Sequence, residues 1–105
     1  MATGLQFRWG ESIDNPTVEQ MQRALAELDV EDGEHPSCWL VHEDSSWVLD
    51  AYEGGRLIWD ELENPDPKPR HMNDVSRAEV LRLWQLLAAG ELAKIESLPW
   101  RPGYY

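Results

Sequence analysis

The chain has 105 residues, of which 42% are hydrophobic, and a formal net charge of −11 at pH 7. This length predicts one domain, residues 1–105, with a single core, because small domains bury only about 60 to 70% of their unfolded surface. The charge argues against direct binding to nucleic acid or to an anionic membrane surface, since phosphates would repel it. Six tryptophans and the hydrophobic content exclude the composition of a disordered acidic chain.

The first elements are predicted from a strand pattern and a helix pattern. Residues 5–9 alternate Leu5, Phe7 and Trp9 with Gln6 and Arg8, which predicts a half-buried strand with the three apolar side chains inward. A helix follows, in which residue 15, an asparagine, suits the N-cap and the next residue, a proline, suits the first helical position. Its predicted buried stripe is Val18, Met21, Leu25 and Leu28.

Three strands are predicted next, over residues 37–42, 46–52 and 55–60. The connections between them are short, which is typical of an antiparallel meander. Alternation predicts that Trp47, Leu49 and Ala51 face the core with Leu57 and Trp59. Val48 and Ile58 are then on the opposite side of the strands. The outer face gathers Asp50, Tyr52, Arg56 and Asp60, with Glu43 and Asp44 in one turn and Glu53 in the other.

The last third of the chain predicts a loop, a second helix and a tail. Residues 62–74 contain three prolines and few apolar side chains, which indicates an exposed loop. Ser76 and Glu79 predict a capping box, Val75 can pack against Val80, and Gly90 suits the C-terminal cap. The predicted buried face of this helix is Val80, Leu83, Trp84 and Leu87. After a short turn of helix, an irregular tail is expected to pack Trp100 and two tyrosines back on the domain.

These elements predict an α+β fold: a single domain with a mostly antiparallel sheet of about four strands and two main helices packed on one face. The other face of the sheet is expected to stay partly open to solvent. Cys38 is the only cysteine, which fits a reducing compartment. The first twenty residues show no signal-peptide pattern and no apolar run is long enough to span a membrane, so a cytoplasmic protein is expected.

Catalytic and metal-binding patterns are weak. His35, Cys38 and His42 have spacings that could serve a metal, but the paired pattern of structural zinc sites is missing. Cys38 could act as a nucleophile beside His35, His42 or His71, yet no nucleophile elbow or phosphate loop accompanies them. The carboxylate pairs at residues 43–44 and 60–61 are expected in solvated positions with ordinary pKa values. Residues 29–32 do not match a calcium loop either. We therefore expect no catalytic residues, no metal and no cofactor.

The negative charge is concentrated in the middle of the chain. Residues 27–66 hold thirteen of the 20 carboxylates, and Arg56 is the only Lys or Arg among them. Surface carboxylates can serve solubility alone, but solubility does not require this asymmetry. An acidic face that carries aromatic side chains favours contact with a basic surface on another macromolecule.

Both ends of the chain resemble a known family. Residues 14–20 (DNPTVEQ), which run into 24–29 (ALAELD), resemble the opening helix of small immunity proteins of bacterial polymorphic toxin systems. Residues 90–92 (GEL) and 98–100 (LPW) are similar to the end of the immunity family often paired with deaminase and other nucleic-acid-directed toxins. The chain departs from that family in its shorter middle. The resemblance implies a non-enzymatic inhibitor that binds a cognate toxin domain inside the producing cell.

We therefore expect an immunity protein that covers the basic active-site cleft of a toxin with its acidic sheet face, as a monomer in a one-to-one complex. The expected partner-binding residues are Glu43, Asp44, Asp50, Tyr52, Glu53, Asp60, Glu61 and Glu63. An exposed Trp39 or Trp59 is a possible additional anchor. One alternative is a small acidic adaptor or nucleic-acid mimic that regulates a basic protein. Another is a small hydrolase or metal enzyme that uses His35, Cys38 and His42.

Overall fold

The computed structural model describes residues 2–64, 66 and 68–104. Over these residues the chain forms three helices and seven strands. In chain order they are β1 (Thr3–Gln6), β2 (Ser12–Asp14), α1 (Val18–Glu27), β3 (Ser37–His42), β4 (Trp47–Tyr52), β5 (Leu57–Glu61), β6 (Arg70–Met72), α2 (Arg77–Ala88), α3 (Leu92–Glu96) and β7 (Arg101–Pro102).

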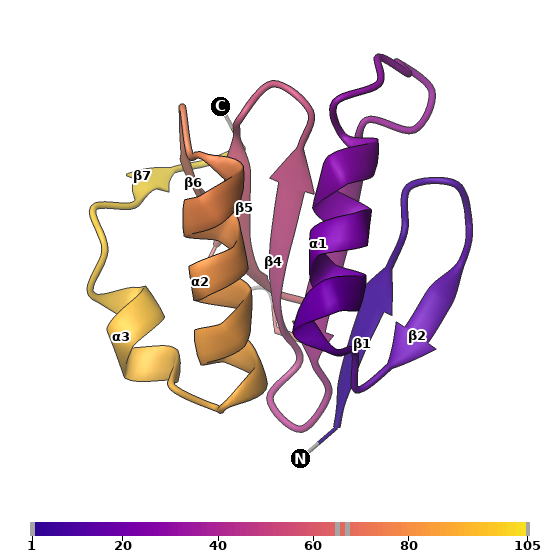
Figure 1. The fold of residues 1–105 in the computed structure, drawn as a ribbon. Helices are drawn as coiled ribbons and strands as arrows, with labels where there is room; N and C mark the ends of the chain where they lie inside the picture. Colours follow the sequence, from indigo (N-terminus) through magenta and orange to yellow (C-terminus); the bar gives the residue numbers. More distant parts are fainter. Residues whose placement is uncertain (1, 65, 67, 105) are drawn as a thin grey trace.

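The seven strands form one antiparallel sheet in the order β2-β1-β3-β4-β5-β6-β7. Helices α1 and α2 lie side by side across one face of this sheet, and α3 lies beside α2 (Figure 1). The predicted α+β class, the antiparallel sheet and the helical layer on one face are confirmed. The predicted number of strands, about four, is wrong.

The three unpredicted strands are the short ones. β2 lies in the segment before α1, β6 lies within the predicted loop 62–74, and β7 lies in the tail. They have two or three residues each, too few to show an alternating pattern, and each forms by pairing with a neighbouring strand. Two prolines of that loop, Pro65 and Pro67, and one tail tyrosine, Tyr105, lie outside the described residues.

The core lies between the helices and the sheet. The helices contribute Met21, Ala24, Leu25, Leu28, Val80, Leu83, Trp84, Leu87 and Ile95, and the sheet side contributes Leu5, Phe7, Cys38, Leu40, Leu49, Ala51, Leu57 and Trp59. Trp59 stacks on Trp47 with ring centroids 4.3 Å apart and on Trp100 at 6.1 Å, so the tail tryptophan packs back as predicted. Val18 was predicted in the α1 stripe but is exposed, because it is the first residue of the helix and lies beyond the sheet contact.

The helix termini differ in part from the sequence prediction. α1 is capped by Thr17, which forms a capping box with Gln20, and not by Asn15. Asn15 has φ +50° and its Oδ1 accepts a hydrogen bond from the backbone N–H of Thr3 at 3.0 Å, so its side chain is used to hold β1. Ser76 caps α2, and its Oγ accepts from the backbone N–H of Glu79 at 3.1 Å. The predicted capping box is formed only in this half, because the carboxylate of Glu79 pairs with Arg82. Gly90 follows that helix with φ +76°, as a C-terminal cap requires.

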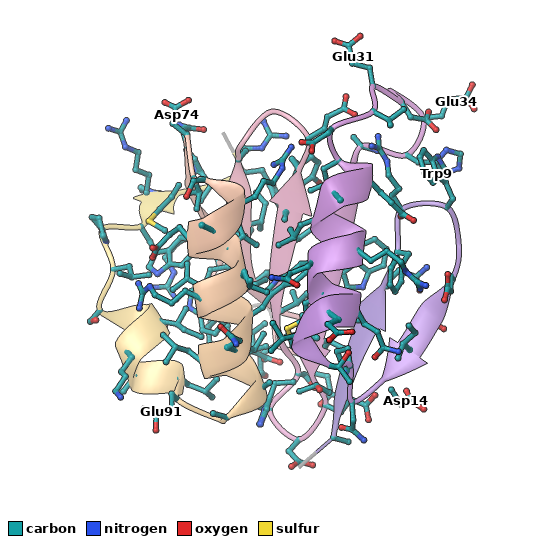
Figure 2. All side chains as sticks on the ribbon, in the orientation of Figure 1. Trp9, Asp14, Glu31, Glu34, Asp74 and Glu91 are labelled. Carbon is teal, nitrogen blue, oxygen red and sulfur yellow. The ribbon has the colours of Figure 1, made fainter. Side chains whose placement is uncertain are left out.

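The last two residues of the first predicted strand, Arg8 and Trp9, lie in environments opposite to those predicted. β1 stops at Gln6, and a turn that includes Gly10 at φ +103° leads into β2. The alternation therefore breaks, Arg8 is buried, and Trp9 is 49% exposed beside the acidic loop between α1 and β3 (Figure 2). The guanidinium of Arg8 donates to the backbone carbonyls of Glu27, Val30, Asp32 and His35 and to the carboxylate of Glu53. No helix in the described part of the chain is long and apolar enough to cross a membrane.

Candidate functional site

The face of the sheet opposite α1 and α2, here called the open face, carries the candidate site. Residues paired directly across antiparallel strands share a face, so the strand register gives its composition. The central row reads Ser12, Gln6, Trp39, Asp50, Ile58, His71 and Arg101 from β2 to β7. The next row reads Asp14, Gly4, Val41, Val48 and Asp60. The predicted outward direction of Asp50 and Asp60 is thus confirmed.

A hollow of ≈ 320 Å³ lies on the open face. Its lining residues are Trp39, Val48, Asp50, Ile58, Asp60, Leu62 and Tyr104. Val48 and Ile58 are almost fully buried although no helix covers this side, so they form an apolar floor. Trp39 and Tyr104 remain 37% and 49% exposed and supply aromatic surface around that floor. The hollow therefore combines apolar and aromatic contact area with two carboxylates.

Asp50 is the carboxylate of the hollow with the most perturbed environment. Burial raises its pKa to about 6, against the lowering effects of the Ser37 and Tyr52 hydroxyls and the positive charge of Arg56. Its Oδ1 atom is buried and accepts no hydrogen bond from the described residues. A carboxylate in this state is ionised at neutral pH, but one of its oxygens lacks the donors that water would supply.

Tyr52 and Arg56 border Asp50 from the end of β4 and the start of β5. The guanidinium of Arg56 lies 4.6 Å from the centre of the Tyr52 ring, which is a cation–π contact. Burial, followed by the negative charge of Asp50, raises the pKa of Tyr52. The phenol therefore stays protonated, and its hydroxyl can serve Asp50 as a donor.

Glu61 lies on the other side of the sheet from Asp50 and Asp60. Leu57, Trp59 and Glu61 alternate onto the helix-covered side of β5, and only 8% of Glu61 is exposed. Its Oε1 accepts from the backbone N–H of Glu63 at 3.0 Å. The structure therefore does not bring Glu61 together with the acids of the open face.

Glu43, Asp44 and Glu63 lie at the end of the sheet where β3 turns into β4. The end of β5 adjoins this turn, since the backbone N–H of Leu62 donates to the carbonyl of Ser46 at 2.9 Å. Glu43 lies against β1, with Oε1 3.2 Å from the position that a Cβ on Gly4 would take. These three acids form a rim beyond the hollow.

Glu53 lies at the opposite end of the meander and has partners within the chain. Its Oε2 accepts from Arg8 at 2.7 Å and from the backbone N–H of Asp32 at 3.1 Å. The Asp32 N–H and the Arg8 guanidinium together lower the pKa of Glu53. This carboxylate braces the turn against the loop after α1.

The side chains considered for metal or nucleophile chemistry have separate surroundings. Cys38 is buried in the core, its thiol donates to the carbonyl of Ala24 at 3.8 Å, and burial raises its pKa to about 12. His42 has Nδ1 2.7 Å from the hydroxyl of Ser45, and His35 contacts Asp32 in the exposed loop. Among the described residues, no group of three or more His, Cys, Asp or Glu side chains is arranged to hold a metal ion. On the open face, His71 has Nδ1 2.9 Å from the carbonyl of Gly103.

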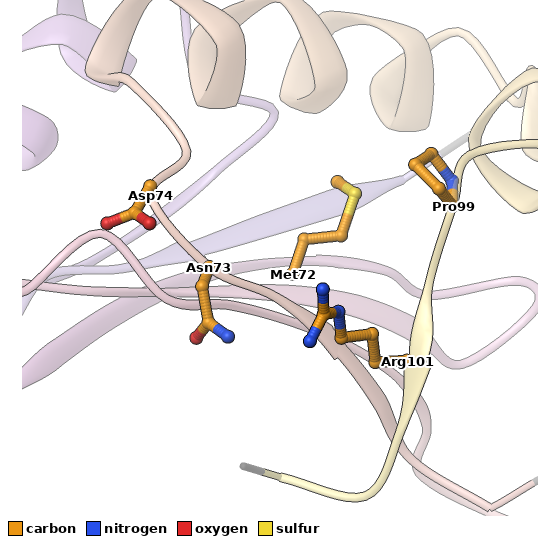
Figure 3. A pocket seen from close by; sticks show the side chains of 5 residues that line it. All are labelled: Met72, Asn73, Asp74, Pro99 and Arg101. Carbon is orange, nitrogen blue, oxygen red and sulfur yellow. The ribbon is translucent and has the colours of Figure 1, made fainter.

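Another hollow, of ≈ 490 Å³, lies between β6 and the segment that leads into β7 (Figure 3). It is lined by Met72, Asn73, Asp74, Pro99 and Arg101. In Figure 3, Asp74 lies at one end of this lining, and Pro99 and Arg101 lie at the other. This lining contains no Ser, Cys or His, so Asp74 is the one lining side chain that could act as a nucleophile or a base.

Several lining residues of the open-face hollow were outside the predicted partner-binding set, namely Val48, Ile58, Leu62 and Tyr104. Val48 and Ile58 have outward positions in the predicted strands. Two apolar side chains on a face open to solvent are a signal from which the hollow could have been predicted. Of the two candidate anchors, Trp39 is exposed and Trp59 is buried. No local pattern signals that the tail returns Tyr104 to this face. The chain matches no protein-family model, no curated protein and no solved structure.

Proposed function

We propose that this protein is a non-enzymatic immunity protein, which binds a cognate bacterial toxin domain through the open face and blocks a basic surface of it. The observation that carries the proposal is the hollow between Trp39 and Tyr104, where apolar contact area and the carboxylates of Asp50 and Asp60 occur together. Protein–protein interfaces combine such aromatic anchors with charged groups.

Charge and anchors contribute differently to this binding. The concentrated negative charge steers a basic partner and raises the rate of association, whereas exposed charges at the rim add little affinity. Trp39, Leu62 and Tyr104 offer the apolar area that slows dissociation, and Glu43, Asp44 and Glu63 supply the acidic rim. A toxin that acts on nucleic acid needs a cationic cleft for phosphates, so an acidic face can both reach and occupy that cleft.

The toxin role in this proposal comes from the resemblance of the two ends of the chain to immunity proteins. A small acidic adaptor or nucleic-acid mimic, which occupies a basic site on another protein, would use the same open face. The two roles differ in the partner that is bound and in what happens to the cell when this protein is lost. An immunity protein protects the producing cell, and its gene is expected directly after that of the toxin.

The test is co-expression of the chain with the product of the gene directly upstream. We expect co-purification in a one-to-one complex and rescue of growth. Asp60→Lys should weaken the complex and change its salt dependence, whereas Glu31→Lys should not, because Glu31 projects from the loop after α1 (Figure 2). An upstream product that is neither toxic nor bound would overturn the immunity role. Equal effects of the two variants would remove the open face as the interface.

A further inference from the structure

We propose that the hollow of the open face receives one arginine side chain of the partner, with its guanidinium hydrogen-bonded to Asp50 and stacked on Trp39. This inference rests on the proposed function and names the group that the open face recognises. Four observations support it: the size of the hollow, the unpaired carboxylate oxygen, the aromatic walls and the engagement of the chain's own arginines.

The size of the hollow suits a side chain. Binding sites for small molecules and cofactors begin at about 300 Å³ and extend to about 1,000 Å³. At ≈ 320 Å³ and open to solvent, the hollow lies at the lower end of this range and has room for one long side chain. Its floor of Val48 and Ile58 can accept the methylene groups of that side chain, which bury well on apolar surface.

The unpaired oxygen of Asp50 defines what should enter. An ionised carboxylate that has lost water is stabilised by a donor that carries positive charge. Oδ1 is almost inaccessible to solvent and has no donor among the described residues, so a guanidinium that bonds to it must first displace the side chains that cover it. The raised pKa of this carboxyl indicates that Ser37, Tyr52 and Arg56 compensate its burial only in part. A guanidinium offers two parallel N–H donors to a carboxylate, which fits this need.

The aromatic walls favour arginine over lysine. Trp39 is the cross-strand neighbour of Asp50, so its indole borders the carboxylate directly, and Tyr104 lines the same hollow. A planar guanidinium stacks on aromatic faces and loses its weaker hydration at lower cost than an ammonium group does. Asp60, also in the lining, adds a second negative charge beside the cation.

The described arginines of this chain have other contacts. Arg8, Arg23, Arg70, Arg77 and Arg82 form ion pairs with Glu53, Glu11, Glu96, Asp29 and Glu79. Arg56 stacks on Tyr52, and Arg101 lines the hollow beside β6. None of them is among the residues that line the open-face hollow, so the position beside Trp39 is available to a side chain from another molecule.

The experiment is an NMR titration of the full chain with two capped tripeptides, acetyl-Gly-Arg-Gly-amide and acetyl-Gly-Lys-Gly-amide, at constant ionic strength. We expect the arginine peptide to shift the Trp39 indole, the Ile58 methyl groups and the Asp50 carboxyl carbon along one saturable curve. Loss of a hydrogen bond to a charged group costs about a factor of ten in affinity, so Asp50→Asn should weaken binding about tenfold. The lysine peptide should bind more weakly than the arginine peptide.

Two controls keep the result interpretable. Asp50→Asn preserves the shape of the side chain, and its thermal unfolding reports whether the fold is retained. Glu31→Gln removes one charge far from the hollow and should leave the titration unchanged. Equal binding of the two peptides, or shifts that Asp50→Asn does not alter, would overturn the inference.

Failure of this inference differs from failure of the proposed function. If the upstream product binds in a manner sensitive to Asp60→Lys but not to Asp50→Asn or Trp39→Ala, the open face is the interface and no arginine enters the hollow. If the arginine peptide binds as expected but the upstream product does not, the recognition chemistry stands and the immunity role is wrong.

Discussion

The two faces of the sheet bury different kinds of side chain. On the helix-covered face the buried core is apolar, and the two fully buried indoles have acceptors: Trp84 donates to the carbonyl of Leu49 at 3.1 Å and Trp59 to Glu96 at 3.2 Å. The buried polar residues of this face, Thr3, His42 and Glu61, lie together at one end of the sheet, and Oε2 of Glu61 has no partner among the described residues. On the open face, Asp50 is partly buried in the middle of the sheet, and its buried Oδ1 atom is unpaired. Since an unpaired buried polar atom costs free energy, Asp50 lowers the stability of the free protein. The difference separates the side chains that hold the fold together from those available to a partner.

The largest expected effect tests this separation with two tryptophans. Trp84→Ala should lower the free energy of unfolding by about 3–5 kcal/mol, because it opens a cavity in the core and removes the hydrogen bond to Leu49. Trp39→Ala should change it by less than about 1 kcal/mol, since Trp39 is partly exposed on the open face. Urea denaturation followed by far-ultraviolet circular dichroism measures both. Similar losses would mean that the open face contributes as much to stability as the core does.

Replacement of the buried Arg8 should give the next largest loss of stability. Arg8 lies at the end of the sheet that contacts the loop after α1. Arg8→Met should destabilise the fold by about 3 kcal/mol, because four carbonyls and the Glu53 carboxylate lose a charged donor. Arg82→Met is the matched control, since its ion pair with Glu79 is exposed and contributes little to stability. Proteolysis near residues 29–36 should increase for Arg8→Met alone. An unfolding curve unchanged by Arg8→Met would contradict the bracing role of this side chain.

A smaller effect, which depends on pH, should appear at Asp50. Its pKa in the folded protein is raised to about 6 from 3.8, so the stability that this group contributes is full below 3.8 and is lost as the pH rises through about 6. Asp50→Asn should therefore unfold like the parent near pH 4 but be about 1–2 kcal/mol more stable than it near pH 7.

The parent protein and the Asp50→Asn variant share the groups that face residue 50. They are Ser37, Tyr52 and Arg56, which act on its pKa, and Trp39, Ile58 and Asp60 in the same hollow, with His71 next along the row. Their contributions therefore cancel in the difference between parent and variant. A difference that does not vary between the two pH values would show that Asp50 is not desolvated.

The smallest effect concerns the cap of α1. Thr17→Ala should cost about 1 kcal/mol, because the hydroxyl no longer accepts from the N–H of Gln20, whereas Thr17→Ser should cost only a few tenths. Since α1 lies on the helix-covered face, both variants should bind the arginine peptide like the parent. A change in that binding would mean that the two faces are coupled.

The central part of the fold followed from hydrophobic alternation. β3, β4 and β5 lie where the pattern predicts them, with the predicted residues inward, because five- or six-residue strands with one buried face show a clear period of two. β2, β6 and β7 carry no such pattern, since pairing with neighbouring strands and not local sequence forms them. Arg8 and Trp9 were assigned to the wrong environments because nothing in residues 5–9 marks the end of the strand at Gln6.

The candidate site was predictable only in part. The outward direction of Asp50 and Asp60 followed from alternation, and the same alternation, carried one residue further, would have assigned Glu61 to the helix-covered side. The engagement of Glu53 by Arg8 depends on residues 45 positions apart, and the return of Tyr104 over β5 depends on the path of the tail. Contacts of this kind arise from the tertiary fold and leave no local signal in the sequence.

The shortness of the outermost strands has a consequence for behaviour at high concentration. β2 has three residues and β7 has two, one of them Pro102, which has no backbone N–H to donate. An exposed sheet edge is a template on which further chains can add and grow into aggregates. Edges this brief, one of them carrying Asp14, offer an incoming strand few hydrogen bonds and a repelling charge. A domain built in this way can leave a whole sheet face uncovered and still resist polymerisation along its edges.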